Sequence, residues 1–412
     1  MAEPKRGPRM PGVVSVCRAL PSDDAPSSHV FVMQRIAAMA KIAEVQALEP
    51  VPYFPLLKPL PGSARLETRH RSGVRIAPVP MFYLPGAFKQ LDGKWMQSAI
   101  APHARRLVDQ GKLDALDAHF GYPEGVACVR LARKLGVDSY LTIRGFEVDL
   151  LGVPAIRRQL LDAIDSASGC ISVSHSLKET MVRNGVDATQ ITVIPNAVDR
   201  TVFAPGDLAL ARRQLGVEGS SPIIVSVGRL VSGKRHHVLV EAFGRLRQRH
   251  PDALLCIIGP ASFENAYPDR LRELASRFGG EQSIRILGSV EQGEVVRWLR
   301  AADVFALATE REGCCNAVLE ALAVGVPVVT TPAGDNPHFV KDGQNGYIVP
   351  VDDVPATAAA LDRAVSAAQW DRQSISRNLE VGDWGNVAGQ VLEYFAERRG
   401  IREQAMMRGN RG

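Results

Sequence analysis

The chain has 412 residues, of which 46% are hydrophobic and 23% are charged, and its formal net charge is +5. This length suggests two domains, and the composition is that of a folded globular protein and not of a disordered chain. The longest apolar stretches, such as 324–329, fall far short of the roughly 18 residues that a membrane-spanning helix needs. The basic first ten residues are not followed by the apolar segment of a signal peptide. We therefore expect a cytoplasmic protein whose six cysteines are buried thiols.

The basic excess lies in the first quarter of the chain. Residues 1–100 hold 13 Lys and Arg against 7 Asp and Glu, while the other 312 residues hold 36 against 37. Such an excess can face an anionic membrane or acceptor, or it can be an ordinary solvated surface. Aromatic residues make up only 6% and do not alternate with basic ones, which argues against a nucleic-acid partner. We expect peripheral contact with the inner face of an anionic membrane through basic residues that include Lys5, Arg6, Arg9, Arg65, Arg69, Arg71 and Arg75.

The first half alternates short β-rich runs with helical patterns. Residues 50–62 contain five prolines, so we predict no regular structure there. The strands are predicted over 12–17, 74–79, 115–119, 139–144, 170–173 and 192–194. The helices are predicted over 30–43, 124–135 and 174–184.

A linker-like segment around 195–222 separates this half from a second alternating series. Its strands are predicted over 223–227, 254–258, 284–287, 304–307 and 326–330, and its helices over 236–249, 269–278, 293–301 and 316–324. A last amphipathic helix is predicted over 386–399. Alternation of this kind indicates two α/β domains with parallel sheets, and ligands bind beyond the carboxyl ends of such strands. We expect a first domain over 1–200 that also holds 386–412, a second over 201–385, and a cleft between them.

The first motif follows the strand predicted at 223–227. Residues 228–234 read G-R-L-V-S-G-K, close to a phosphate-binding P-loop, but Arg235 stands where Ser or Thr must hold Mg²⁺. We therefore reject a P-loop nucleotidase. A glycine after a strand still lets the backbone approach an anion, and Arg229 and Lys234 can clamp a diphosphate. A solvated basic turn is the alternative.

The second motif is Glu312-Gly-Cys-Cys-Asn-Ala-Val-Leu-Glu320. Gly313 places Glu312 on the loop before the helix, whereas Glu320 lies within it. Eight residues are just over two helical turns, so both carboxylates can point toward one ligand and accept hydrogen bonds from vicinal hydroxyls. On its own, the pattern favours a solvated helix glutamate beside a loop glutamate. A further candidate, His119, ends a strand, where either a site or a structural hydrogen bond is found.

These segments resemble the retaining glycosyltransferases of the GT-B fold, and within them family 4, which carries an E-x7-E motif. The resemblance rests on GRLVSGK, on EGCCNAVLEALAVGVPVV with its G-x-P-V-V, and upstream on DAHFGYPEGVACVRLARKLGV, LTIRGFEVD and VIPNAVDRTVF. It covers about residues 110–400, whereas the first hundred residues match poorly. The tail around Trp384 resembles a helix that crosses back onto the N-terminal domain. The resemblance implies a GT-B fold, with two Rossmann-like domains facing across a cleft.

The resemblance also implies a role for each matching residue. Arg229 and Lys234 would hold the donor diphosphate, and Glu320 the nucleotide ribose. Glu312 would contact the transferred sugar, together with the loop of Gly313, Cys314, Cys315 and Asn316. His119 would face the sugar from the N-terminal domain as a second catalytic residue, with Arg144 and Gly145 lining the same cleft. The family's Gly-Gly loop is missing after the first strand, where Ser27 and Ser28 stand, and in its R-G-x-D motif the acid would be Glu147.

We therefore predict a retaining, metal-independent glycosyltransferase without a cofactor. It would move a sugar from a UDP-, GDP- or ADP-sugar to a saccharide or lipid-linked saccharide acceptor in exopolysaccharide or glycolipid biosynthesis. Metal independence is expected because no D-x-D motif is found and two cations already face the diphosphate. Retention is expected by a front-face route, since no carboxylate is evidently placed as a nucleophile. Another GT-B enzyme, such as an epimerase or phosphorylase, and a non-catalytic subunit remain as alternatives.

Overall fold

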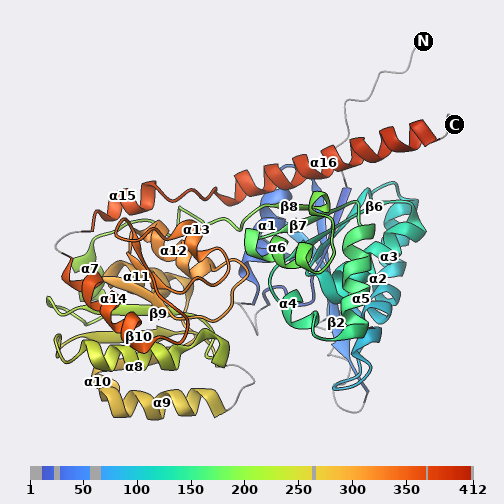
Figure 1. Cartoon of the computed structure of the whole chain (residues 1–412). Coiled ribbons are helices and arrows are strands. Elements are labelled where there is room, and N and C mark those ends of the chain that lie inside the picture. Colours follow the sequence, from blue (N-terminus) through green and yellow to red (C-terminus); the bar gives the residue numbers. More distant parts are fainter. Residues whose placement is uncertain (1–11, 23–27, 56–65, 262–265, 368–369, 410–412) are drawn as a thin grey trace. The chain divides into compact units, whose positions relative to one another are not determined.

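The computed structural model describes residues 12–22, 28–55, 66–261, 266–367 and 370–409. The chain divides into two compact units (Figure 1). The first is formed by Met1–Ala197 with Trp384–Gly412, and the second by Val198–Asp383. These bounds differ by a few residues from those predicted at 200 and 385.

The first unit is built on one sheet with the strand order β3-β4-β2-β1-β5-β6-β7-β8. All neighbouring strands in it are parallel except β3, which runs antiparallel to β4. Parallel neighbours need crossover connections, which are usually helices, and this agrees with the alternation of strands and helices in the sequence. The strands are β1 Gly12–Val16, β2 Glu44–Tyr53, β3 Arg69–Arg71, β4 Val74–Phe82, β5 Ala115–His119, β6 Asp138–Ile143, β7 Gly169–Ser172 and β8 Ile191–Val193.

Helices cover this sheet. One cluster of buried side chains joins the sheet to α1 and α16, while α2, α3 and α5 pack against one another. Short turns lie at residues 89–91, 121–125 and 188–190. The helices are α1 Val30–Met39, α2 Asp92–Asp109, α3 Val126–Leu135, α4 Glu147–Leu150, α5 Pro154–Ser166, α6 His175–Arg183 and α16 Trp384–Gly409.

The C-terminal helix α16 returns to the first unit, as the sequence predicted. The Phe395 ring stacks on Tyr140 of β6 with 3.7 Å between ring centroids, and the Tyr140 hydroxyl donates to the Phe395 carbonyl at 2.8 Å. Farther along, Arg399 and Arg402 both pair with the carboxylate of Asp138, at 2.9 and 2.5 Å. Aromatic stacking and these ion pairs fix the helix against the sheet although it is remote in sequence.

The prediction for residues 50–62 was wrong over its first part, because β2 continues through Pro50 and Pro52. β2 pairs with β1 only as far as Leu48, so beyond that point it has one neighbour, β4. Successive residues of a strand direct their N–H groups to opposite sides, so Pro50 and Pro52 share one side, and the ladder to β4 can form on the other. Proline is tolerated where one side of a strand has no neighbour. Residues 56–62 lie outside the described part of the chain.

The second unit holds a parallel sheet with the strand order β11-β10-β9-β12-β13-β14. The strands are β9 Ile223–Val227, β10 Leu254–Ile258, β11 Ile284–Gly288, β12 Val304–Leu307, β13 Val328–Thr330 and β14 Gly346–Ile348. The helices are α7 Leu208–Gln214, α8 His236–Leu246, α9 Ala266–Phe278, α10 Gly280–Ser283, α11 Gln292–Ala301, α12 Asn316–Val324, α13 Asn336–Phe339, α14 Val354–Ser366 and α15 Arg372–Arg377, with a short turn, η5, at Ser232–Lys234.

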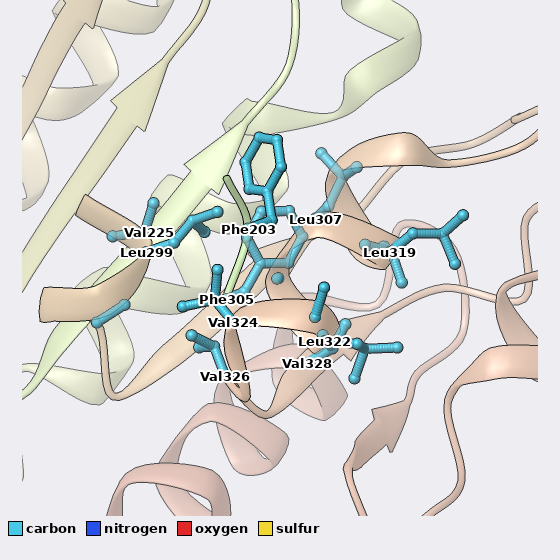
Figure 2. Close-up of a cluster of buried hydrophobic side chains, with 14 of the residues drawn as sticks. Phe203, Val225, Leu299, Phe305, Leu307, Leu319, Leu322, Val324, Val326 and Val328 are labelled. Carbon is cyan, nitrogen blue, oxygen red and sulfur yellow. The ribbon is translucent and has the colours of Figure 1, made fainter. Parts of the chain in front are cut away.

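Both faces of this second sheet are buried. Val225 of β9 belongs to the cluster shown in Figure 2, which packs Phe305 and Leu307 against Leu319 and Leu322 of α12. Ile224, the next residue of β9, belongs to the cluster on the opposite face, with α8, α9 and α14. Alternate burial on two faces explains why the strands read as continuous apolar runs, as is usual in parallel sheets. The packed core fixes the strand ends from which the loops at 228–235 and 308–315 start.

Candidate functional site

The loop over residues 228–235 follows β9 and leads into α8. It is attached to the end of β10, because the Gly228 amide donates to the Ile258 carbonyl at 2.9 Å and the Leu230 amide to the Pro260 carbonyl at 3.0 Å. A Cβ atom at Gly259 would lie 1.9 Å from the Gly228 carbonyl oxygen, so this approach requires glycine. The loop is thereby held at the carboxyl edge of the sheet, where open α/β sheets bind ligands.

Two predicted site residues meet at this edge. Lys234 ends the turn η5, and Glu312 lies on the loop that follows β12. The Lys234 Nζ atom is 2.5 Å from Glu312 Oε1, and the two side chains are 22% and 9% exposed. Burial acts to lower the pKa of Lys234, but the Glu312 carboxylate raises it above its ordinary value. Lys234 is therefore charged at neutral pH and already lies beside the first glutamate of the E-x7-E motif.

The two loops are also joined through their backbones. The Glu310 amide donates to the Gly233 carbonyl at 2.9 Å, and the Thr309 hydroxyl donates to the same oxygen at 3.3 Å. A third segment supports the acidic loop, since the Thr331 hydroxyl donates to the Thr309 carbonyl. Gly334 has φ +59°, and a Cβ atom there would lie 2.9 Å from the Glu312 carbonyl oxygen. Close backbone approach therefore sets the position of Glu312.

Glu320 lies in α12, about one turn beyond the start of the helix at Asn316. The residue is half-buried, and burial raises the pKa of its carboxyl group from 4.5 to about 8. Within the described residues, Glu320 makes no hydrogen bond or ion pair. A carboxyl group that is desolvated without a partner is costly, which is the state expected of a group that awaits hydroxyl donors from a ligand.

The remaining predicted residues of this unit lie around the pair. The Arg229 side chain is exposed, makes no ion pair within the described part of the chain, and exerts a repulsive effect on the charge of Lys234, which places the two cations near each other. Gly313, Cys314, Cys315 and Asn316 connect Glu312 to α12. α12 begins without a side-chain cap, so its positive end lies in this loop. Two cations and a helix N-terminus make this edge suitable for an anion.

In the first unit, His119 and Arg144 also come together. Arg144 Nη2 lies 3.0 Å from His119 Nδ1, and its Nη1 atom donates to Asn196 Oδ1 at 3.0 Å. Because an arginine can only donate, His119 Nδ1 must accept, and the neutral ring then carries its proton on Nε2. Nε2 lies 3.2 Å from Asp117 Oδ2, although not in hydrogen-bond alignment. The His119 side chain is completely buried, and burial lowers its pKa to about 4, so the ring is neutral.

Other buried charges complete this cluster. Arg35 donates to Asp117 Oδ1 at 2.9 Å and to the Thr142 hydroxyl at 2.7 Å. The Glu147 carboxylate accepts from the amides of Gly145 and Arg144, at 2.9 and 3.0 Å, and from the Gly121 amide at 2.7 Å. Glu147 therefore fixes the turn at Gly145 from within. Because Gly121 follows β5 and Gly145 follows β6, the Glu147 carboxylate also holds these two loops together.

The sequence predicted the residues of the two pairs, Lys234 with Glu312 and His119 with Arg144, but not several residues that contact them or their loops. Asp117 and Arg35 were not considered, although Asp117 stands two residues before His119 and so shares its side of β5. Arg235, Glu310 and Asp352 form a further ionic group beside Lys234. Nothing in the local sequence pattern links Arg235 to Asp352, because their contact depends on how two distant loops fold.

Comparisons with known proteins identify the family. Residues 209–379 match the family described as Glycosyl transferases group 1, and residues 60–202 match Glycosyltransferase Family 4. Over residues 209–379 the chain belongs to the group 1 glycosyltransferases. The two matched segments follow the two units of the fold and together span about three quarters of the chain.

Several curated relatives are named D-inositol 3-phosphate glycosyltransferase. D-inositol 3-phosphate glycosyltransferase of Corynebacterium urealyticum is 31% identical over 257 residues, which is 59% of this chain and 60% of that protein. The protein of that name from Nocardia farcinica is 34% identical over 222 residues, or 52% of this chain and 48% of that one. The chain thus spans about half the length of the curated relatives it matches.

Solved structures confirm the expected GT-B fold of this glycosyltransferase. Sucrose-phosphate synthase from Thermosynechococcus elongatus superimposes with a TM-score of 0.78 at 18% identity, covering 95% of this chain and 100% of that one. Anabaena HepE, crystallised with UDP and glucose, gives 0.74 at 18% identity, covering 94% and 100%. At such identities the likeness concerns the fold.

Proposed function

We propose that this group 1 glycosyltransferase is a retaining enzyme that moves a sugar from a nucleotide-diphosphate sugar to an acceptor hydroxyl. The observation that carries the proposal is the Lys234–Glu312 pair at the carboxyl edge of the second sheet. A cation for the leaving diphosphate and a carboxylate for the sugar hydroxyls are already in contact there. Structures of Anabaena HepE with UDP and with UDP-glucose support a nucleotide-sugar donor.

In the proposed complex, Lys234 and Arg229 bind the diphosphate and stabilise the charge that develops on it. Binding would draw Lys234 from Glu312 toward phosphate, which frees the Glu312 carboxylate to accept hydrogen bonds from the transferred sugar. The amides of Gly313–Asn316 would face the sugar and phosphate, and Glu320 the ribose. The leaving phosphate would take the acceptor proton in the front-face route.

The catalytic role of His119 stays a prediction. The ring is fully buried, and both of its nitrogens face protein groups. In this state it orients Arg144, and direct contact with a sugar would require it to leave that partner. The proposal for donor binding does not depend on this contact.

A panel of nucleotides should identify the donor. UDP, GDP, ADP and their glucose conjugates are added separately, and the melting temperature is recorded. A ligand at about 100 times its Kd stabilises the folded state by about 2.7 kcal/mol, or roughly 5–10 °C for a unit of this size. We expect one base to give the shift with and without its sugar, and Lys234→Ala to reduce it to half or less. No shift with any of the six would contradict a nucleotide-sugar donor.

The transferase activity should survive EDTA. Arg229 and Lys234 supply the positive charge that a divalent ion would give to the diphosphate. Turnover is followed by direct detection of the glycosylated product, because coupled assays can contain enzymes that themselves need Mg²⁺. Full loss with EDTA and recovery with Mg²⁺ or Mn²⁺ would overturn the metal-independent mechanism.

We further propose a saccharide or lipid-linked saccharide as acceptor, in exopolysaccharide or glycolipid synthesis, with the first unit contacting an anionic membrane. Exposed aromatic and apolar side chains support this along residues 82–91, where Phe82, Phe88 and Leu91 are 37%, 58% and 37% exposed. Phe82 packs edge-on against Trp95 at 5.0 Å between ring centroids, and Lys94 is exposed next to it. Rings and basic groups of this kind favour membrane interfaces. No helix in the described residues is long and apolar enough to cross a membrane.

Some of the basic residues expected to contact the membrane interact with other residues of the first unit. Arg69 pairs with Glu49 at 2.8 Å, and Arg75 donates to Gln46. Lys5, Arg6, Arg9 and Arg65 lie outside the described residues. The aromatic residues therefore add a contribution that charge alone does not provide.

Co-sedimentation with liposomes tests the membrane contact. Binding should require anionic lipid and fade with salt, since each Lys or Arg near the surface contributes about 1 kcal/mol and the Debye length is roughly 8–10 Å. Phe88→Asp should weaken binding, whereas Ile42→Asp, at a residue of similar exposure elsewhere in the unit, should not. No binding at low salt would favour a soluble acceptor, and D-inositol 3-phosphate, named in the curated relatives, is the first one to try.

A further inference from the structure

Arg235 stands where the P-loop pattern fails, and its backbone conformation is unusual. It precedes α8 with φ 53° and ψ 31°, in the left-handed region that residues with a Cβ atom rarely occupy. Such strain persists only where the surroundings enforce it, and it is frequent at functional sites. The side chain of Arg235 shows what enforces it.

The guanidinium group of Arg235 joins three loops. Nη2 is 2.8 Å from Glu310 Oε2, on the loop after β12. Nε is 2.9 Å from Asp352 Oδ1, between β14 and α14, an ion pair that is not in hydrogen-bond alignment. Nη1 donates to the Ser232 carbonyl at 3.0 Å within its own loop. Asp352 also has a positive φ, 60°. Two strained residues on separate loops are therefore tied to each other through one side chain.

This contact lies next to the pair that carries the proposed function. Lys234 directly precedes Arg235, and Glu312 is two residues after Glu310. The Glu310 amide also bonds to Gly233, so the two loops are joined on both sides of Lys234. Lys234 and Arg235 therefore contact the same loop, at two glutamates that stand two positions apart.

We propose that Arg235 is a positioning residue for the donor site. By binding Glu310 and Asp352 at once, it holds the loop of Lys234 against the loop of Glu312, so that the cation and the carboxylate meet the sugar nucleotide in fixed positions. The inference rests on the proposed function, but it concerns the geometry of the site and not the identity of the donor. Arg235 itself contacts neither phosphate nor sugar.

The expected effect is moderate. The Arg235 side chain is 21% exposed, and its partners are 39% and 53% exposed, so each ion pair is partly screened by solvent. Partly exposed pairs have small effects singly and larger ones in a network. We expect Arg235→Gly to raise the donor KM about three- to tenfold, with a smaller change in kcat.

Glycine is the informative substitution because it occupies the left-handed region without strain. Arg235→Gly removes the ion pairs and relieves the backbone, so the melting temperature should stay level or rise while donor affinity falls. A purely structural role would lower stability instead. Arg235→Lys keeps one charge but cannot span two carboxylates, and it should fall between wild type and Arg235→Gly.

The test measures donor KM, kcat and melting temperature with UDP-glucose, or with the conjugate that the nucleotide panel selects. Arg245→Ala, at an exposed arginine of α8, is the matched control and should behave as wild type. In the double variant Arg235→Gly/Glu310→Gln, the loss of donor affinity should be smaller than the sum of the losses in the two single variants, because both changes remove the same ion pair. Higher salt should raise the donor KM of wild type more than that of Arg235→Gly.

The outcomes separate the two proposals. If wild type binds no nucleotide sugar, the proposed function fails. If wild type binds and Arg235→Gly has the same KM, or if the losses of the two single variants add in full in the double variant, Arg235 does not position the site. A parallel fall in melting temperature and activity that Arg235→Lys does not relieve would also overturn the inference.

Discussion

Replacing Lys234 with alanine should lower kcat/KM for the sugar nucleotide by about ten- to a hundredfold, since a hydrogen bond to a charged group contributes roughly 1.5–3 kcal/mol. Arg229→Ala should have an effect of the same kind. Both would be measured by initial rates at varied donor concentration, with melting temperatures recorded alongside. Wild-type kinetics in both variants would remove the basis for the diphosphate assignment.

The two variants should differ in their effect on the stability of the fold. Arg229 is exposed without an ion-pair partner in the described part of the chain, so Arg229→Ala should alter binding and leave stability unchanged. Lys234→Ala instead leaves Glu312 without its partner. A buried carboxylate that loses its cation destabilises the fold. The double variant Lys234→Ala/Glu312→Gln should recover the stability but not the donor affinity, which separates binding from folding.

Much of the secondary structure of the second unit was predictable because its strands are buried on both faces, although α7, β14, α14 and α15 were not predicted. Strands β9, β10 and β12 and helix α12 have the predicted bounds. Each is a short apolar run between turn residues, and in such segments local pattern and tertiary burial agree. The helices α2 and α5 were not predicted. Pro102 lies inside α2 and α5 begins at Pro154, and a proline obscures a helical pattern in the sequence.

That Lys234 and Glu312 belong to one site was predictable only through the family resemblance. Spacing put Glu312 and Glu320 on one ligand, but nothing in the residues between Lys234 and Glu312 indicated that their side chains meet 78 positions apart. The burial of His119 was also beyond sequence reasoning, since a histidine that ends a strand can face solvent or a network. In the fold, Arg35 binds Asp117 from a helix more than 80 residues away in the sequence and so completes the buried network around His119.

The two glutamates should respond differently to neutral replacement. Glu312→Gln should chiefly lower kcat, because contacts to the transferring sugar change along the reaction. The donor KM should stay level or fall, since Lys234 is then free for phosphate. Glu320→Gln should raise the donor KM about tenfold with little change in kcat, because ribose contacts are equal in the ground and transition states. The same kinetic pattern in both variants would contradict this division of roles.

The raised pKa of Glu320 adds a pH dependence to this prediction. With a pKa of about 8, Glu320 is mostly protonated at neutral pH, whereas the ionised form is the better acceptor for two ribose hydroxyls. Donor affinity of the wild type should therefore rise from pH 6 through pH 8 and level off near pH 9. Glu320→Gln should show a flat profile, and a matching rise in the variant would assign the titration to another group.

Stability should change in the opposite direction. Because the folded state holds a proton on Glu320 that the unfolded chain loses near pH 4.5, this residue's contribution to the free energy of unfolding is largest below pH 4.5 and declines until about pH 8. Glu320→Gln removes that decline. Since the residue is only half-buried, we expect a gain of about 1 kcal/mol at pH 8, or roughly 2–4 °C, and little at pH 5. A variant that melts below wild type at pH 8 would show that the Glu320 carboxyl group stabilises the free protein and does not await a ligand.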